Sequence, residues 1–223
     1  MIKQPKGKKK KMTKKTILYL LTLLLFYILE YVLGFFLTKG FTNLLLKIEP
    51  KNYLLNFNIS LILSKLLIFF LVLFLISKIK IKNLIRYSKI DYKLVIFSLV
   101  IGLGYFIINR YIFDANFKMN IKPDAYNSSL LYLSGAIVIG PIYEEVLYRG
   151  IGFEFLKSTG ISDAVIIIFT SLVFGLIHLP DLDAVFGTFA LGLICSICYL
   201  KTRNIIYPIC IHAFYNFLMF NII

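Results

Sequence analysis

Long apolar runs separated by short charged segments make up most of the chain. Each run approaches the roughly 20 residues that an α-helix needs to cross the apolar core of a bilayer. The pattern predicts an all-α fold, a polytopic transmembrane helical bundle of about seven spans, within a range of six to eight. The predicted spans cover residues 16–38, 54–77, 94–113, 128–156, 162–179, 184–200 and 205–222.

Polar residues and a proline mark the ends of several spans. Ser128 or Ser129 is placed to cap the fourth span and Asn204 to cap the seventh, because short polar side chains accept hydrogen bonds from the free amides of a first helical turn. Pro180 and Asp181 predict a turn between the fifth and sixth spans.

The composition fits a membrane protein. The sequence is 59% hydrophobic, against about 45–50% in an ordinary soluble domain. The predicted spans use most of its 223 residues, so no sizeable soluble domain is expected. We predict a basic tail at residues 1–15 and one membrane domain at residues 16–223.

The net charge of +14 comes from positions that favour lipid over nucleic acid as a partner. Eight of the 25 Lys and Arg residues lie in the first fifteen positions, and six more lie in residues 78–93. Such segments remain cytoplasmic and attract anionic lipids. With seven spans and the tail inside, 18 basic residues fall on the inner side and 6 on the outer side. We predict a multi-pass protein of the cell membrane with a cytoplasmic amino terminus.

Three ionisable residues lie close together in the fourth span. Glu145 and Arg149 are four residues apart, so on a helix they share a face and can form an ion pair, whereas Glu144 points about 100° away. Charges at membrane depth persist where they pair, face a wet cavity or perform a function. This motif alone is compatible with a structural ion pair as well as with catalysis.

The two histidines of the chain favour the second interpretation. His178 follows Phe174 by one turn near the end of the fifth span, and His212 precedes Asn216 by one turn in the seventh. Polar residues in separate membrane helices are expected to converge on one polar cavity within the membrane.

Three kinds of chemistry fit this set. Glu144 can act as a general base toward water while His and Asn side chains stabilise an oxyanion. Glu144, His178 and His212 can instead hold a divalent metal such as zinc in an open site, although no H-E-x-x-H signature is present. A proton relay in a transporter is the third option. Nucleophilic catalysis by Ser171 or Ser196 is weaker, because no G-x-S-x-G context surrounds them.

Two further charges lie inside predicted spans, Glu30 in the first and Lys65 in the second. Their opposite signs suggest a structural ion pair between these helices. Cys195, Cys198 and Cys210 all lie in apolar runs, where they are expected to be small packing residues.

The polar residues stand in a recognisable order. Glu-Glu-x-x-x-Arg at 144–149, Phe-x-x-x-His at 174–178 and His-x-x-x-Asn at 212–216 lie on successive predicted helices. Together with the Asn-Ile-Ile-Tyr-Pro segment at 204–208, they resemble the CAAX-protease and bacteriocin-processing family of intramembrane endopeptidases, the Abi family. The protease-like motif core is placed at residues 128–223.

This resemblance implies a helical membrane protease whose cavity opens toward the cytosol and to lipid. By the resemblance, Glu144 activates water with help from His178, and His212 and Asn216 form the oxyanion site. The substrate would be a membrane-associated peptide or protein, and a need for metal is not implied by the motifs.

The remaining motif residues receive supporting roles from the resemblance. Glu145 with Arg149 would hold the helix and tune Glu144, and Phe174 would support the site. Members of the family are also linked to bacteriocin processing and self-immunity, so a non-catalytic immunity or binding protein of the same fold is the main alternative, and a proton-coupled transporter is a third.

Overall fold

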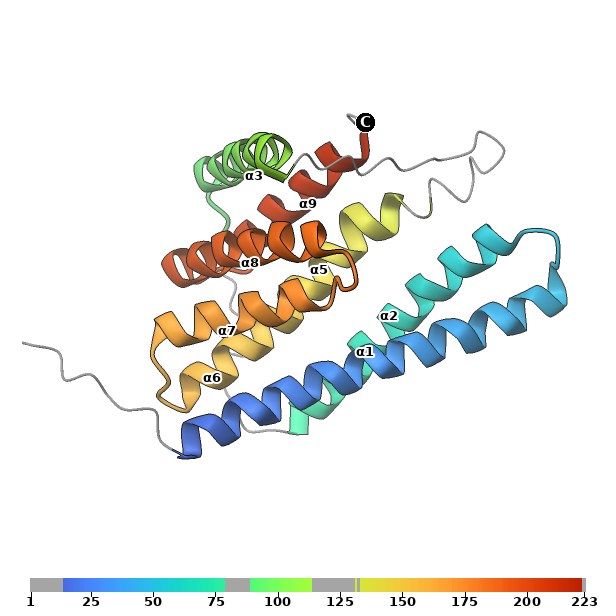
Figure 1. Ribbon diagram of the computed structural model, residues 1–223, viewed down its shortest axis with the longest axis horizontal. Helices are drawn as coiled ribbons and strands as arrows, with labels where there is room; N and C mark the ends of the chain where they lie inside the picture. The colour runs from blue at the N-terminus through green and yellow to red at the C-terminus, as the bar shows by residue number, and fades with distance from the viewer. Residues whose placement is uncertain (1–13, 79–88, 114–130, 132, 222–223) are drawn as a thin grey trace, which may run out of the picture.

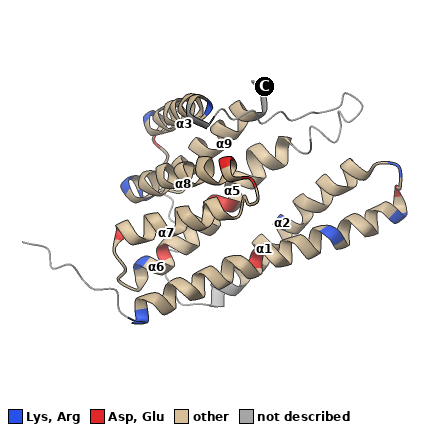
Figure 2. Ribbon diagram, in the orientation of Figure 1, with Lys and Arg blue, Asp and Glu red and all other residues tan. Residues whose placement is uncertain are grey.

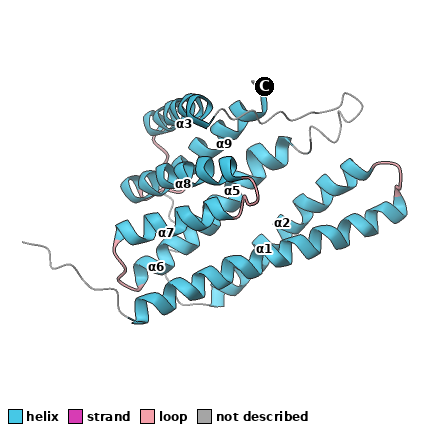
Figure 3. Ribbon diagram, viewed as in Figure 1, coloured by secondary structure: helices cyan, strands magenta, loops and turns pink. Residues whose placement is uncertain are grey.

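The computed structural model describes residues 14–78, 89–113, 131 and 133–221. All regular elements in these ranges are helices (Figure 3). In chain order they are α1 Lys14–Ile48, α2 Tyr53–Lys78, α3 Tyr92–Phe113, η2 Gly135–Ile139, α5 Gly140–Glu145, η3 Val146–Phe153, α6 Glu154–Ser158, α7 Asp163–Leu176, α8 Leu182–Thr202 and α9 Ile206–Asn221. The predicted all-α bundle is confirmed. Most of the predicted basic tail, much of the 78–93 loop and the caps predicted at Ser128 or Ser129 lie outside the described residues.

Four of the described helices are long and apolar enough to cross a membrane. They are α1, the Tyr53–Phe74 part of α2, the Tyr92–Tyr111 part of α3, and α8. The apolar stretches of α7 and α9, Asp163–Leu176 and Ile206–Met219, are shorter. Charged residues lie mostly near helix ends, with a few at interior positions (Figure 2). The protein is a membrane protein by these criteria.

The fourth predicted span is built from four consecutive pieces rather than one regular helix. η2, α5, η3 and α6 follow one another without a loop from Gly135 to Ser158, alternating π and α geometry. A π-turn changes which carbonyl each amide bonds, and such turns are frequent at functional sites. Two carbonyls here accept side-chain bonds from other helices: Leu147 O from Tyr27, at 3.4 Å, and Ala136 O from Asn216, at 2.8 Å.

The first span is longer than predicted. The sequence analysis ends it at residue 38, before Lys39 and Gly40, but α1 continues to Ile48. A single glycine costs a helix only about 1 kcal/mol, so Gly40 is a weak stop. Pro50 provides the stronger stop, because a proline disfavours helical geometry in the residue before it.

The helices form two groups in space. α1 and α2 pair along their lengths as a hairpin, which lies on one side of the other helices (Figure 1). In the second group, α7 packs along α8, and α9 packs against both α3 and α8. The α7–α8 approach depends on Gly175, where a Cβ atom would lie 2.8 Å from the Val185 carbonyl oxygen.

The turn between α8 and α9 confirms one predicted cap. Asn204 Oδ1 accepts a hydrogen bond from the Ile206 amide at 3.0 Å. Arg203, with φ at 51°, ends α8 in the left-handed conformation. Its guanidinium lies 3.1 Å from Glu154 Oε1, which ties this turn to the start of α6.

Candidate active site

A fully buried ion pair anchors the site. Arg149 Nη1 donates to Glu145 Oε1 at 2.9 Å, and neither side chain has any exposed surface. The pair joins the end of α5 to η3, four residues apart, as the spacing predicts. In an apolar interior a charge without a partner is far more costly than a paired one, so each residue requires the other.

Arg149 also binds the helices behind the site. Its Nη2 donates to the Gly192 carbonyl at 2.9 Å, and its Nε lies 3.4 Å from Ser196 Oγ. Its guanidinium carbon lies 4.9 Å from the centre of the Phe174 ring. Gly192 permits this approach, since a Cβ there would lie 3.3 Å from Nη2 and 3.0 Å from the Ser171 backbone. Arg149 therefore joins α8 and α7 to the helix that carries Glu144.

His212 lies against the other side of the Glu145 carboxylate. Its Nδ1 is 3.0 Å from Glu145 Oε1. A carboxylate held by an arginine only accepts hydrogen bonds, so Nδ1 must carry the proton. In neutral His212, Nε2 then presents a lone pair, and this atom lies 3.9 Å from Glu144 Oε2. The two adjacent glutamates thus have different partners: Glu145 orients the imidazole by one nitrogen, and Glu144 faces the other.

His178 lies outside the helix in which the sequence placed it. α7 ends at Leu176 rather than near residue 179, and His178 is in the turn that leads to Pro180. The difference arises because Pro180 disfavours helical geometry just before it. The ring is held by a hydrogen bond between Nδ1 and the Phe174 carbonyl, at 3.0 Å. A carbonyl only accepts, so Nδ1 carries the proton here too.

Phe174 is the common neighbour of both imidazoles. Its ring is fully buried and meets the His178 and His212 rings edge-to-face, with centroids 5.5 and 5.6 Å apart. The Arg149 guanidinium faces the same ring. Phe174 therefore supports the site by filling the space between its charged residues.

The structure adds a residue that sequence reasoning assigned elsewhere. Lys65 Nζ, from α2, donates to Glu144 Oε1 at 3.1 Å, and both side chains are partly exposed. The predicted pairing of Lys65 with Glu30 is replaced: Glu30 accepts a hydrogen bond from the Tyr143 hydroxyl. Lys65 Nζ also lies 5.7 Å from the centre of the Tyr143 ring. An isolated positive charge inside an apolar helix was the only signal for this residue.

The polar side chains from these separate segments line one cavity of about 310 Å³. Glu144, His178, His212 and Asn216 all border it, together with Lys65. Asn216 uses one amide hydrogen on the Ala136 carbonyl of η2, and its amide carries a second. Motifs up to 72 positions apart in the chain therefore meet around one space.

The described residues do not form a metal site. No group of three or more His, Cys, Asp or Glu side chains in the described ranges is arranged to hold one ion. The Lys65 ammonium occupies Glu144 Oε1, and a cation at that position opposes a second one. This ammonium disfavours zinc held by Glu144, His178 and His212.

Comparison with known proteins identifies the segment that carries the site. Residues 126–218 match the family described as Rce1-like, type II CAAX prenyl endopeptidase. This match confirms the resemblance drawn from the three motifs, all of which it includes, and the family is one of proteases. No curated protein and no solved structure matches the chain. The match does not extend to α1 or α2, so Lys65 lies outside it.

Proposed function

We propose that this protein is an intramembrane endopeptidase that hydrolyses a peptide bond in a membrane-associated peptide or protein, with water activated by Glu144. The observation that carries this proposal is the meeting of Glu144, His178, His212 and Asn216 at one cavity. We place the protein in the cell membrane with its basic amino terminus in the cytoplasm.

The proposed reaction starts with water between Glu144 and the scissile carbonyl. The Glu144 carboxylate takes a proton from the water as its oxygen attacks the carbonyl carbon. The carbonyl oxygen becomes an oxyanion. When the carbon–nitrogen bond breaks, the protonated Glu144 returns the proton to the leaving amine. In neutral His178, the free Nε2 accepts a hydrogen bond and can orient the water.

Three side chains at the cavity can stabilise the oxyanion. The second amide hydrogen of Asn216 is one donor. His212 Nε2 donates only when its ring carries two protons, because Nδ1–H is committed to Glu145. The Lys65 ammonium supplies a positive charge beside Glu144. Donors fixed in a low-dielectric site stabilise developing charge more than donors in water do.

The test compares Glu144→Gln with the parent protein in liposomes that contain a library of membrane peptides. Removing a general base costs about 10²–10⁴-fold in rate. Glu49→Gln is the matched control, because Glu49 is exposed and lies beyond the end of α1. Cleavage by Glu144→Gln at the parent rate would exclude the proposed mechanism.

The Lys65–Glu144 ion pair favours one alternative, a non-catalytic immunity protein of the same fold. A carboxylate bound to an ammonium is less available to water than a free one. Family members are linked to bacteriocin processing and self-immunity, so the alternative is tested by protection of cells from a bacteriocin. Protection that persists in Glu144→Gln and His178→Ala proteins would favour binding over proteolysis.

A further inference from the structure

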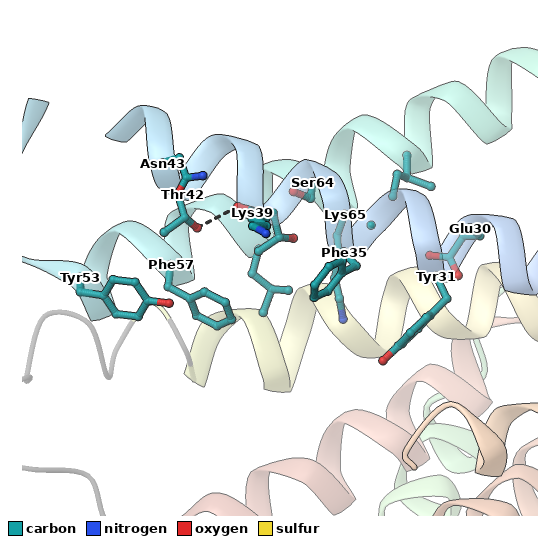
Figure 4. Close-up of a pocket in the computed structure, with 14 residues that line it drawn as sticks. Glu30, Tyr31, Phe35, Lys39, Thr42, Asn43, Tyr53, Phe57, Ser64 and Lys65 are labelled. Carbon is teal, nitrogen blue, oxygen red and sulfur yellow. Dashed lines mark hydrogen bonds between the residues drawn. The ribbon is translucent and has the colours of Figure 1, made fainter. Parts of the chain in front are cut away.

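A second and larger cavity lies between α1 and α2. Its volume is about 580 Å³, and it runs along the hairpin from Tyr53 and Phe57 at one end to Glu30 and Tyr31 at the other (Figure 4). Its walls carry both aromatic rings and polar groups. We call this cavity the hairpin groove. Neither the motifs nor the matched family segment includes it.

The hairpin groove adjoins the active-site cavity. Leu61 and Lys65 border both spaces, and Lys65 Nζ is the atom that bonds Glu144. Figure 4 shows Lys65 between the two ends of the groove. A chain that lies in the groove therefore passes the ammonium group that marks the edge of the proposed catalytic site.

The dimensions of the groove suit an extended peptide. Its α1 wall reaches from residue 30 to residue 43, which is about 20 Å at 1.5 Å per residue. An extended chain covers that length with about six residues.

One end of the groove lies near a membrane surface. α1 has 35 residues, so it is about 52 Å long, against about 30 Å for the apolar core of a bilayer. Lys14 and Lys15 at its first turn favour a membrane surface. About 20 residues further along, the apolar core ends close to Lys39. The groove therefore leads from the opposite surface into the membrane.

The charge of the groove indicates what the peptide carries. Lys39 is exposed in the groove wall and has no ion-pair or hydrogen-bond partner among the residues that the structure describes. Asn43, one turn later, adds amide donors on the same wall. Lys65 and Glu30 already have partners. The free cation favours a carboxylate on the bound segment.

We propose that the hairpin groove binds an extended segment of the substrate, with a carboxylate near Lys39 and the scissile bond beside Lys65 and Glu144. This inference rests on the proposed protease function and adds the substrate class. The substrate is a peptide that enters the membrane at the Lys39 end of α1 in an unwound, extended conformation. Exposed backbone groups of such a segment require polar partners, which a lipid surface lacks; Lys39 and Asn43 in the groove wall supply donors.

Adjacent phenylalanines provide a matched test. Phe35 lines the groove and Phe36 does not, yet both side chains are about equally exposed, at 60% and 63%. Photoreactive p-benzoylphenylalanine is placed at either position in the Glu144→Gln protein, which is then irradiated in liposomes with the biotin-labelled peptide library. We expect peptide capture at position 35 and at least tenfold less at position 36. Equal capture, capture of phospholipid only, or none at position 35 would overturn the proposal.

Kinetics separate this inference from the proposed function. With a peptide that the parent protein cleaves, Phe35→Ala is expected to raise KM roughly tenfold with little change in kcat, and Phe36→Ala to change neither. An unchanged KM in Phe35→Ala would overturn substrate binding in the hairpin groove, while the proposed protease function would stand. Peptide capture at position 35 without Glu144-dependent cleavage would support peptide binding in the hairpin groove and refute water activation by Glu144.

The carboxylate has its own control. Lys39→Gln is expected to raise KM for peptides that carry an acidic residue and not for their amide counterparts. Lys47→Gln alters an exposed lysine on the same helix that does not line the groove. The same KM for acidic and amide peptides in the parent protein would remove the carboxylate from the proposal.

Discussion

Replacing Arg149 by methionine is expected to destabilise the protein strongly. The substitution leaves the Glu145 carboxylate buried without its cation, still bonded to neutral His212 Nδ1, and one of its oxygens already has no hydrogen bond there. It also removes the donor to the Gly192 carbonyl and the cation above the Phe174 ring. Loss of one member of a buried ion pair typically costs about 3–5 kcal/mol.

The double variant Arg149→Met with Glu145→Gln separates the ion pair from simple packing. With both charges removed, no uncompensated charge stays buried, so the double variant is expected to be more stable than Arg149→Met alone. Replacing both members of a buried pair is often neutral or stabilising. The difference between the single and double variants measures the cost of the orphaned carboxylate.

Cys195 offers a direct assay for these variants. It is a free thiol, fully buried beside this site, so a fluorogenic maleimide reacts with it only when the fold opens. Thermal scans in detergent would report the temperature at which its labelling begins. Cys198 and Cys210, which are partly exposed, are replaced beforehand. The buried ion pair would not have the expected importance if Arg149→Met lowered the free energy of unfolding by less than about 1 kcal/mol, or if the double variant were less stable than the single one.

Three further predictions concern other parts of the molecule. Lys65→Met is expected to lower kcat by roughly 10²-fold and Lys65→Arg to retain most activity, because arginine keeps the positive charge beside Glu144; equal rates would exclude a role for that charge. Gly175→Ala is expected to lower the Cys195 labelling temperature, since its Cβ would meet a carbonyl oxygen at 2.8 Å. Gly104→Ala, which meets nothing within 4 Å, should leave that temperature unchanged or raised. With a cytoplasmic tail, Asn43→Cys should react with a membrane-impermeant maleimide applied outside intact cells, and labelling only after permeabilisation would reverse the orientation.

Much of the fold could be predicted from the sequence because long apolar runs bounded by charged or polar residues mark where helices begin and end. The predicted sixth and seventh spans agree with α8 and α9 to within two residues at each described end. Local chemistry decides the exceptions. Hydropathy does not show that α1 continues past Gly40, because a single glycine is only a weak break. It also does not show the π-turns of the fourth span, where carbonyls accept bonds from side chains of other helices.

The candidate site could be predicted only as far as motifs reach. Four-residue spacing fixes the Glu145–Arg149 contact, because one helix carries both residues. Pairing between helices is not fixed in this way. By charge alone, Lys65 could pair with either Glu30 or Glu144. The relative positions of α1, α2 and α5 place it against Glu144. The roles of Glu144, His178, His212 and Asn216 in catalysis stay predictions.

The separation of the α1–α2 hairpin from the other helices has an evolutionary consequence. Two tyrosines link the hairpin to the helical segment formed by η2, α5, η3 and α6: the Tyr27 hydroxyl donates to the Leu147 carbonyl, and the Tyr143 hydroxyl donates to Glu30. Apart from Lys65, the residues proposed for catalysis lie outside the hairpin, so the rest of the hairpin can diverge without altering them. Under the proposed function, a lineage that retains the motif helices and Lys65 can acquire new substrates by altering the rest of the hairpin, so its members would share a reaction and differ in their targets.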